Sequence, residues 1–546
     1  MKRNIVLYTF LIVFKTISAQ DIKKDVTVVK QYEPTVQDVT KISLLPSFND
    51  TSTLNPAFDY KISPVRIDLP FTPRPVPAAK MVQEPIKRLY NNYIKLGYGI
   101  PFSPLVELSA GNGRSKENLV GIFLRHHSAN GKVKINDNVK IDAPYSDNEV
   151  DLYGTHILKN SILSGNVYYT GNKTTFYGID TTATISYDNK DYSQHYQKGG
   201  FIVKLESNTT DSDKLNYKTK TGFAYLSDDY NFVENNFVIQ AKAGKNYKKL
   251  FIGASVDLNY FKPESGNDSI YNTVFKLRPF LSRKSDLWRF EIALDITFDS
   301  ETGKTSLFSY PTALLEFNVA PSVLKAFVAL QGFHETNNLD KIRKENPYIL
   351  PGLYVKNTNY KTHIFGGFKG SFSSTLNFMT SLAYSNIENQ YFFINDTLAT
   401  SGFHNYFQVV YDNIDKVQVA AELDYTPSEK ISITAKGNFY NYTTFRQAKP
   451  WHLPNFDASL RIQYNLRDKI ILTAETFFVG ERFAKKGTRI VSLNPYADLN
   501  LGAEYRYSKL LSAFVQVRNL TAAEYDIWNQ YPVYRFQIMV GFTYMF

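Results

Sequence analysis

The last thirteen residues of the chain, Tyr534 to Phe546, place an apolar or aromatic side chain at every even-numbered position. Successive side chains of a β-strand point to opposite faces, so this pattern predicts a strand with one uniformly apolar face. Aromatic residues lie near both ends of that face, as in the girdles of outer-membrane barrels. A half-buried strand in a soluble sheet is the alternative, and the remaining sequence has to separate the two. The expected lipid-facing residues are Tyr534, Phe536, Ile538, Val540, Phe542, Tyr544 and Phe546.

The N-terminus has the features of a secretory signal. Lys2 and Arg3 precede a short apolar stretch, and small residues suited to cleavage follow at Ile17–Gln20. The apolar stretch is too short to span a bilayer, and no other apolar run of about 18 residues occurs. The chain also contains no cysteine, so an exported protein of this kind must rely on hydrogen bonds and packing, which suits a closed barrel. We expect residues 1–20 to be a signal peptide.

Composition supports a membrane barrel over a soluble enzyme. The 39 Tyr and 40 Phe bring the aromatic content to 15%, which is high for a globular enzyme. The mean hydropathy of −0.29 resembles that of a soluble protein, but only alternate residues of a barrel strand face lipid. The net charge of +11 favours an anionic lipid surface over nucleic acid, because the chain is expected to be exported.

From about Tyr93 onward, segments of alternating apolar and polar residues are separated by turn-rich links. Tight links such as residues 466–469 alternate with longer ones such as 444–454, 481–495 and 520–533. Short periplasmic turns opposite longer outer loops are typical of outer-membrane barrels, and the repeat of about 40–50 residues expected of a propeller is absent. The clearest strands are Leu287–Phe298, Val417–Tyr425, Ile431–Phe439, Phe456–Tyr464 and Ala497–Tyr507.

These segments predict an all-β fold, a large transmembrane antiparallel β-barrel spanning residues 91–546. About 23 candidate strands can be counted, but a single-chain bacterial barrel has an even number, and roughly 20 residues per strand and connection gives about 22. The two least regular segments are Tyr93–Ile100 and Gln390–Asp396. One of the candidate strands is therefore expected to be absent from the barrel.

Charged residues recur on the face opposite the apolar one, which is the expected lumenal face. Unpaired buried charges cost several kcal/mol each, so many charges of both signs require water or one another. A barrel of eight strands fills its interior with packed side chains, so this pattern favours a wider one. Each residue alone is expected to be an ordinary lumenal ion pair. The lumenal charges are Arg289, Glu291, Asp295, Glu422, Asp424, Lys436, Arg461, Glu475, Asp498, Glu504 and Arg506.

Residues 21–90 differ from the rest of the chain. They contain nine prolines and little periodicity, and Thr72–Pro77 is expected to be extended, polyproline-II-like chain. We predict an extended N-terminal arm, periplasmic or lumenal, without a packed core. A plain linker is the alternative.

Two C-terminal regions resemble TonB-dependent receptor barrels. One runs from Pro450 to Arg482, and the other contains Val515–Leu520, Glu524–Asn529 and the closing strand. The resemblance implies a 22-stranded barrel, a plug and a TonB box. The chain departs from it because too few residues precede Tyr93 for a standard plug, and it is similar to plugless TonB-receptor-like barrels. An acidic residue followed by an extended apolar stretch, which could add as a strand to a partner, resembles a TonB box at Asp25, Val26, Thr27, Val28 and Val29.

The sequence predicts no catalytic, cofactor or metal site. His126 and His127 are adjacent, so they point to opposite faces of a strand and cannot readily share a metal. The carboxylates of Glu422 and Asp424, about 7 Å apart along a strand, fit lumen lining better than hydrolysis. Phosphate-binding loops, nucleophile elbows and zinc-protease motifs do not occur. Trp451, His452 and Trp528 lie in long loops, either as ligand or partner contacts or as interfacial anchors.

Together these features predict a protein of the outer membrane of a Gram-negative bacterium, a TonB-dependent receptor-like transporter or channel for an unidentified solute. The alternative is a non-transporting barrel subunit of an outer-membrane assembly or export complex. Expected partners are outer-membrane lipid, the barrel-assembly machinery, and TonB or other envelope proteins reached through the N-terminal arm. No enzymatic activity, cofactor or nucleic-acid partner is expected.

Overall fold

The structure is a computed structural model. The chain divides into two units, residues 1–84 and 85–546, and the fold described below belongs to the second. The expected signal peptide, the proline-rich arm and the TonB-box-like segment Asp25–Val29 lie outside the described residues. The structure describes residues 92–112, 117–135, 139–178, 192–209, 211, 213–265, 268–269, 271–321, 323–396 and 406–546.

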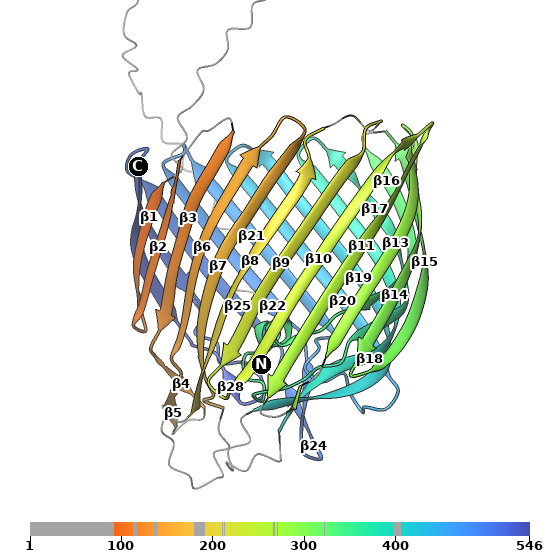
Figure 1. Cartoon of the computed structure of the whole chain (residues 1–546). Helices are drawn as coiled ribbons and strands as arrows, with labels where there is room; N and C mark the ends of the chain where they lie inside the picture. Colours follow the sequence, from red (N-terminus) through yellow and green to blue (C-terminus); the bar gives the residue numbers. More distant parts are fainter. Residues whose placement is uncertain are drawn as a thin grey trace, which may run out of the picture. The chain divides into compact units, whose positions relative to one another are not determined.

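The second unit is a closed antiparallel β-barrel of 22 strands (Figure 1). The barrel closes where β1 (Tyr93–Ile100) pairs with β29 (Gln537–Met545), from Tyr93 opposite Met545 to Ile100 opposite Ile538. On its other side β1 pairs with β2 (Ser103–Gly111). The remaining barrel strands are β3 (Asn118–Ala129), β6 (Tyr145–Ile157), β7 (Ser161–Thr175), β8 (Ser193–Ser207), β9 (Asn216–Asp228), β10 (Phe232–Tyr247), β11 (Leu250–Ser265), β13 (Asn272–Lys284), β14 (Trp288–Glu301), β15 (Lys304–Ala320), β16 (Leu324–Glu335), β17 (Thr358–Ser373), β18 (Leu376–Asn395), β19 (Phe407–Ser428), β20 (Ile431–Thr444), β21 (Phe456–Leu466), β22 (Ile470–Val479), β25 (Tyr496–Arg506) and β26 (Leu511–Arg518).

The predicted fold class is confirmed, and the strand count resolves at the two irregular segments. Tyr93–Ile100 is a barrel strand, β1. Gln390–Asn395 does not form a strand of its own but continues β18 to Asn395, paired with β19. The number of barrel strands is therefore even, as the closure of an antiparallel sheet requires.

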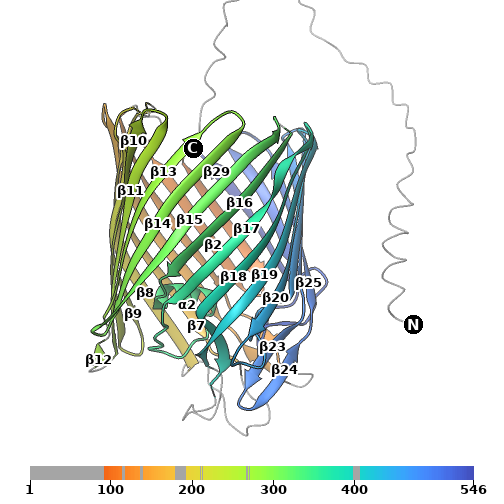
Figure 2. The same ribbon diagram turned by 90° about the vertical axis from the view of Figure 1, so that its right-hand side faces the viewer.

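The two ends of the barrel differ (Figures 1 and 2). The backbone N–H of Phe546 donates to the Asn92 carbonyl at 2.9 Å, so both ends of the barrel chain lie at one rim, together with the tight turns. Short turns face the periplasm in bacterial barrels, so we call this the periplasmic rim and the opposite side the outer end. The outer end carries helix α2 (Leu339–Glu345), β12 (Asp268–Ser269) and the hairpins β4 (Lys132–Lys134) with β5 (Lys140–Asp142), β23 (Arg482–Lys486) with β24 (Arg489–Leu493), and β27 (Asp526–Trp528) with β28 (Tyr531–Pro532). No helix in the described part of the chain is both long and apolar enough to cross a membrane.

The closing strand presents apolar side chains outward, as its alternation indicates. Five of these side chains lie on the lipid-facing side of the barrel wall and are 42–50% exposed; they are Phe536, Val540, Phe542, Tyr544 and Phe546. Tyr534 is placed differently. It precedes β29, and its hydroxyl donates to backbone carbonyls of the loop between β3 and β6, so it belongs to the outer loops.

The closing seam requires a glycine at Gly541. It lies opposite Gly97, and a Cβ at Gly541 would collide with the Leu96 carbonyl and the Phe514 ring. We expect Gly541→Ala to lower the free energy of unfolding by about 1–3 kcal/mol, the usual cost of overpacking. The urea midpoint of the heat-modifiable gel shift measures this. Gly437→Ala is the matched control, because its Cβ would meet nothing closer than 4.0 Å. Equal midpoints for the two variants would contradict the assignment of close packing to the seam.

Candidate functional site

The charges predicted to line the lumen mostly occur in ion pairs, either between neighbouring strands or within one strand. Their side chains are only partly covered, at 60% exposure for Arg461, 52% for Lys436 and 49% for Arg289. Exposed pairs of this kind contribute about 0–1 kcal/mol each, so they indicate a wet lumen more than a stabilising network. The pairs are Arg289–Glu291 (3.6 Å), Arg278–Glu291 (3.0 Å), Arg278–Asp295 (3.7 Å), Lys436–Glu422 (2.9 Å), Arg461–Glu475 (3.3 Å) and Arg506–Glu504 (3.3 Å).

Two of the predicted lumenal carboxylates accept hydrogen bonds from hydroxyl groups instead. Asp424 accepts from the Thr434 hydroxyl at 2.7 Å, and Asp498 accepts from the Tyr525 hydroxyl at 2.7 Å. Asp424 and Glu422 therefore have separate partners on β20, which does not resemble a catalytic carboxylate pair.

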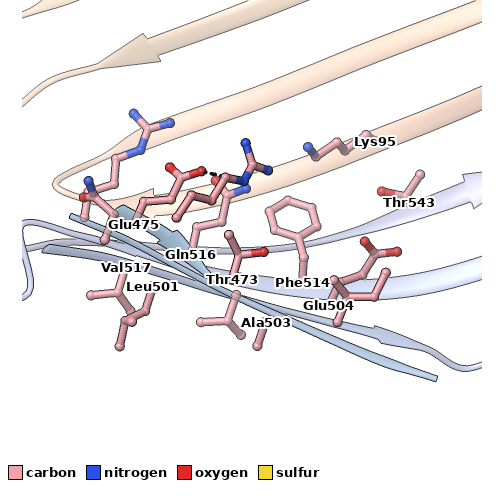
Figure 3. Close-up of a pocket in the computed structure, with 16 residues that line it drawn as sticks. Lys95, Thr473, Glu475, Leu501, Ala503, Glu504, Phe514, Gln516, Val517 and Thr543 are labelled. Atoms are coloured by element: carbon pink, nitrogen blue, oxygen red, sulfur yellow. Dashed lines mark ion pairs between the residues drawn. The ribbon is translucent and has the colours of Figure 1, made fainter. Parts of the chain in front are cut away.

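A cavity of about 490 Å³ lies along the lumenal wall near the closing seam (Figure 3). Its charged lining includes Lys95, Arg518 and the Arg461–Glu475 pair. The Lys95 ammonium lies 4.8 Å from the centre of the Phe514 ring. Within the described residues, neither Lys95 nor Arg518 forms an ion pair with a carboxylate. These two cations were not predicted from the sequence, although each occupies a lumenal position on a strand of alternating apolar and polar residues.

A hydrophobic cluster, which we call the outer cap, lies at the outer end of the barrel. It brings together α2 and its flanking loop, the loops after β3, β7 and β26, and the outer ends of β8, β9, β10, β18 and β19. Complete burial of each large apolar side chain contributes roughly 1.5–3 kcal/mol, so the cap is a small core and not a loose set of loops. Its buried members are Val133, Ile141, Ala143, Tyr177, Tyr196, Leu226, Phe232, Leu339, Ile342, Ile349, Val355, Tyr391, Phe393, Phe407 and Tyr531.

Helix α2 is attached to the barrel wall by a buried carboxylate. Asp340 lies 2.6 Å from the Lys198 ammonium on β8, 2.6 Å from the Arg343 guanidinium and 2.9 Å from Lys344. Burial alone raises the pKa of Asp340, but Arg343 and Lys198 outweigh it and hold the pKa below its usual range. The helix begins after Asn338, whose side chain accepts from the Lys341 N–H at 2.9 Å, as an N-cap residue does.

Arg343 is itself buried, with a side chain only 5% exposed. In addition to Asp340, its guanidinium donates to the Asn172 side chain at 2.9 Å and lies 5.0 Å from the centre of the Tyr196 ring. The backbone N–H of Leu339 donates to the Glu234 carboxylate at 3.0 Å. Contacts from β7, β8 and β10 therefore all converge on one turn of helix.

Trp451, His452 and Trp528 are packed between outer loops, which differs from both roles considered for them. Trp451 is 2% and His452 6% exposed. The His452 ring contacts Trp528 at 5.1 Å and Phe407 at 5.5 Å between centroids. These residues join the loop after β20 to the outer cap.

Both ring nitrogens of His452 have partners that require the neutral imidazole. Nδ1 lies 3.0 Å from the Phe393 carbonyl and donates to it, while Nε2 accepts from the Asn529 N–H at 3.3 Å. Burial lowers the pKa of His452 to about 3, and the nearby Arg482 adds to the shift. Arg482 in turn donates to the backbone carbonyls of Ile527 and Asp526, at 2.6 and 2.7 Å.

The histidine pair on β3 separates as expected. His126 lies 2.7 Å from the Asn148 side chain, whereas His127 lies 3.3 Å from the Ser103 hydroxyl. Within the described ranges, no group of three or more His, Cys, Asp or Glu side chains is arranged to hold a metal ion.

Comparison with known proteins adds the fold relationship. No protein-family model and no curated protein sequence matches this chain. Among solved structures, the FrpB iron transporter from Neisseria meningitidis has a TM-score of 0.67 at 8% identity, covering 84% of this chain and 82% of its own. The chain has the fold of outer-membrane receptor barrels. The ferric-catecholate import receptor Fiu from Escherichia coli K12 shares this receptor fold, with a TM-score of 0.62 at 10% identity over 84% of this chain and 82% of its own.

A third structure with the receptor fold is the pyoverdine outer membrane receptor FpvA from Pseudomonas aeruginosa. Its TM-score is 0.62 at 12% identity, covering 83% of this chain and 78% of its own. The predicted resemblance to TonB-dependent receptor barrels in the outer membrane is thus confirmed for the fold.

Proposed function

We propose that the protein is a receptor-like transporter or channel of the outer membrane, which passes an unidentified solute through its lumen. The partly exposed lumenal ion pairs support this proposal most directly, because a lumen lined by hydrated charges is suited to polar solutes. The fold shared with an iron transporter and siderophore receptors is consistent with it. Enzymatic activity forms no part of the proposal, because these neighbours are transport proteins.

We also propose that partners are engaged through the N-terminal region. The sequence Asp25, Val26, Thr27, Val28 and Val29, an acidic residue followed by mostly apolar ones, is suited to adding as a strand to TonB. Co-purification of TonB with the wild-type chain, and its loss in Val28→Pro, is the result that this part of the proposal requires. Insertion by the barrel-assembly machinery is expected for a barrel of this size.

Conductance in planar bilayers tests the transport proposal. In this reading the outer cap keeps the resting conductance low, and Ile342→Asp raises it several-fold, because a carboxylate at this fully buried position disrupts the cap. Ile490→Asp makes the same chemical change at a position 52% exposed on β24, and it should leave the conductance unchanged. Heat-modifiable migration on a gel confirms that both variants form the barrel.

The same pair of variants is measured in a chain lacking residues 21–90, so that the arm cannot determine the outcome. If the Ile342→Asp variant keeps a low conductance in both the full-length chain and the chain lacking residues 21–90, a channel role is contradicted. That result would favour the second candidate, a non-transporting barrel subunit of an outer-membrane assembly or export complex. The buried core of the outer cap is the observation that favours this candidate, and stoichiometric co-purification of a partner is its direct test.

A further inference from the structure

The ends of two neighbouring hairpins at the periplasmic rim carry an excess of positive charge. We call this surface the basic rim. Strands β11 and β13 are paired, so the β10–β11 turn lies beside the β13–β14 turn. Within the described residues, none of these cations forms an ion pair with a carboxylate. The only carboxylate in the two turns is Asp286, and Asp213 of the adjacent turn is within reach of Asn246. The basic rim comprises Lys245, Lys248, Lys249, Arg283 and Lys284.

Part of the basic rim belongs to the lipid-facing side of the wall. Lys245 lies opposite Ile252, which is 46% exposed on the outer surface, and Ile252 lies opposite Leu281. Arg283 lies opposite Phe290, and Phe290 shares the lipid-facing side of β14 with Ile292, so Arg283 is also on the lipid-facing side. These side chains are therefore at the boundary between the bilayer and the periplasm, where long cationic side chains extend toward the headgroups.

Aromatic rings accompany the cations. The Arg283 guanidinium lies 5.4 Å from the centre of the Trp288 ring, and the Lys248 ammonium lies 5.6 Å from the centre of the Tyr247 ring. Tyr247 is 61% exposed. Tyr and Trp are enriched at the depth of lipid headgroups, so the rings place the cations at that depth.

Short side chains occupy the next lipid-facing row. Ala243 lies opposite Ala254, and Ala254 lies opposite Pro279, all three exposed on the outer surface. Beside this row are the larger Ile252 and Leu281. A hydrocarbon chain can therefore approach the backbone more closely here, immediately next to Lys245.

We propose that the basic rim binds an anionic glycerophospholipid of the periplasmic leaflet. Its phosphodiester lies between Lys245 and the two lysines of the β10–β11 turn on one side and Arg283 on the other. Strands β10 and β13 are two interstrand spacings, about 10 Å, apart, so long side chains from both can reach one phosphate. An acyl chain lies along Ala243, Ala254 and Pro279. Basic pockets at this membrane depth recognise anionic headgroups by charge, whereas the lipid of the outer leaflet lies at the opposite end of the barrel.

Native mass spectrometry of the full-length protein in detergent tests the proposal, with phosphatidylglycerol and phosphatidylcholine as probes. The wild-type protein should retain phosphatidylglycerol at least tenfold more strongly than phosphatidylcholine. Changing Lys245, Lys248, Lys249 and Arg283 to Gln should remove this preference. The matched control changes Lys430, Arg467, Lys469 and Lys509 to Gln, which removes the same charge from other turns of the same rim and should keep the preference.

A second variant tests the acyl-chain contact without changing any charge. Ala254→Trp fills the row of short side chains and should weaken retention of phosphatidylglycerol several-fold, while inorganic phosphate should not compete in any variant. The proposal is overturned if the wild type shows no preference for phosphatidylglycerol, or if the two fourfold variants lose it equally. Displacement by inorganic phosphate would identify a free-anion site instead.

Discussion

Replacing Asp340 with Ala will open the outer cap. The change leaves Lys198 and Arg343 without their shared carboxylate, and their side chains are only 15% and 5% exposed. Removing one partner of a buried ion pair costs about 3–5 kcal/mol, because the remaining charge is uncompensated. We expect a loss of this size in the free energy of local opening, measured by hydrogen exchange of the amides in residues 339–345.

Glu335→Ala is the matched control for this prediction. Glu335, the last residue of β16, lies 2.7 Å from Lys341 on α2, but both side chains are more than one third exposed. A solvent-screened pair of this kind contributes less than about 1 kcal/mol. If the two substitutions accelerate exchange of α2 equally, Asp340 does not anchor the helix.

The contribution of Asp340 to stability also depends on pH, because the pKa of Asp340 is lowered in the folded state. The contribution is present above the ordinary pKa of an aspartate and is lost as the pH falls below that value.

Acidification will open the same region through His452. Its folded pKa of about 3 lies below the ordinary value of 6.5, so between these values the open state binds a proton that the closed state does not. Stability of the closed cap therefore falls as the pH drops below 6.5, by about 1.4 kcal/mol per pH unit. At pH 5 the loss is about 2 kcal/mol. Acrylamide quenching of Trp451 and Trp528 fluorescence, recorded from pH 7 to pH 4, follows it.

His452→Gln keeps a donor and an acceptor but cannot titrate, so its quenching curve should be flatter over this range. His126→Gln changes a histidine outside the cap and should retain the wild-type pH profile. Trp288→Phe in every sample removes the only other tryptophan of the chain. Identical pH profiles for His452→Gln and the wild type would assign the acid response to other groups, such as the carboxylates of the outer loops.

The barrel could be predicted because its determinants are local. Each strand alternates with a period of two, and that alternation alone assigns the lumenal side of Arg461, Glu475 and Glu504. The number of strands could not be predicted from local sequence at one place. Gln390–Asn395 resembles a separate segment in the sequence, but it pairs with the outer end of β19 and so lengthens β18. Pairing over a distance is decided by the partner strand and is not visible in one segment.

The outer cap could not be predicted for a related reason. It brings Tyr177, Tyr348 and Tyr531 into ring contact, although more than 170 residues separate each from the next. No periodicity encodes such contacts. A usable signal was present in the long loops, where large aromatic residues such as Trp451 and Trp528 occur outside the alternating segments. Exposed aromatic side chains are unfavourable in water, so they indicate packing between loops.

The unequal strand lengths have a consequence for how the protein meets its surroundings. About 9–11 residues of tilted strand suffice to cross a bilayer. β1 and β2 have 8 and 9 residues, whereas β18 and β19 have 20 and 22. Roughly half of the β18–β19 hairpin therefore stands clear of the lipid as ordered sheet. The wall of the barrel is therefore uneven: folded sheet rises beyond the lipid at β18 and β19, whereas the wall at β1 and β2 has no comparable height.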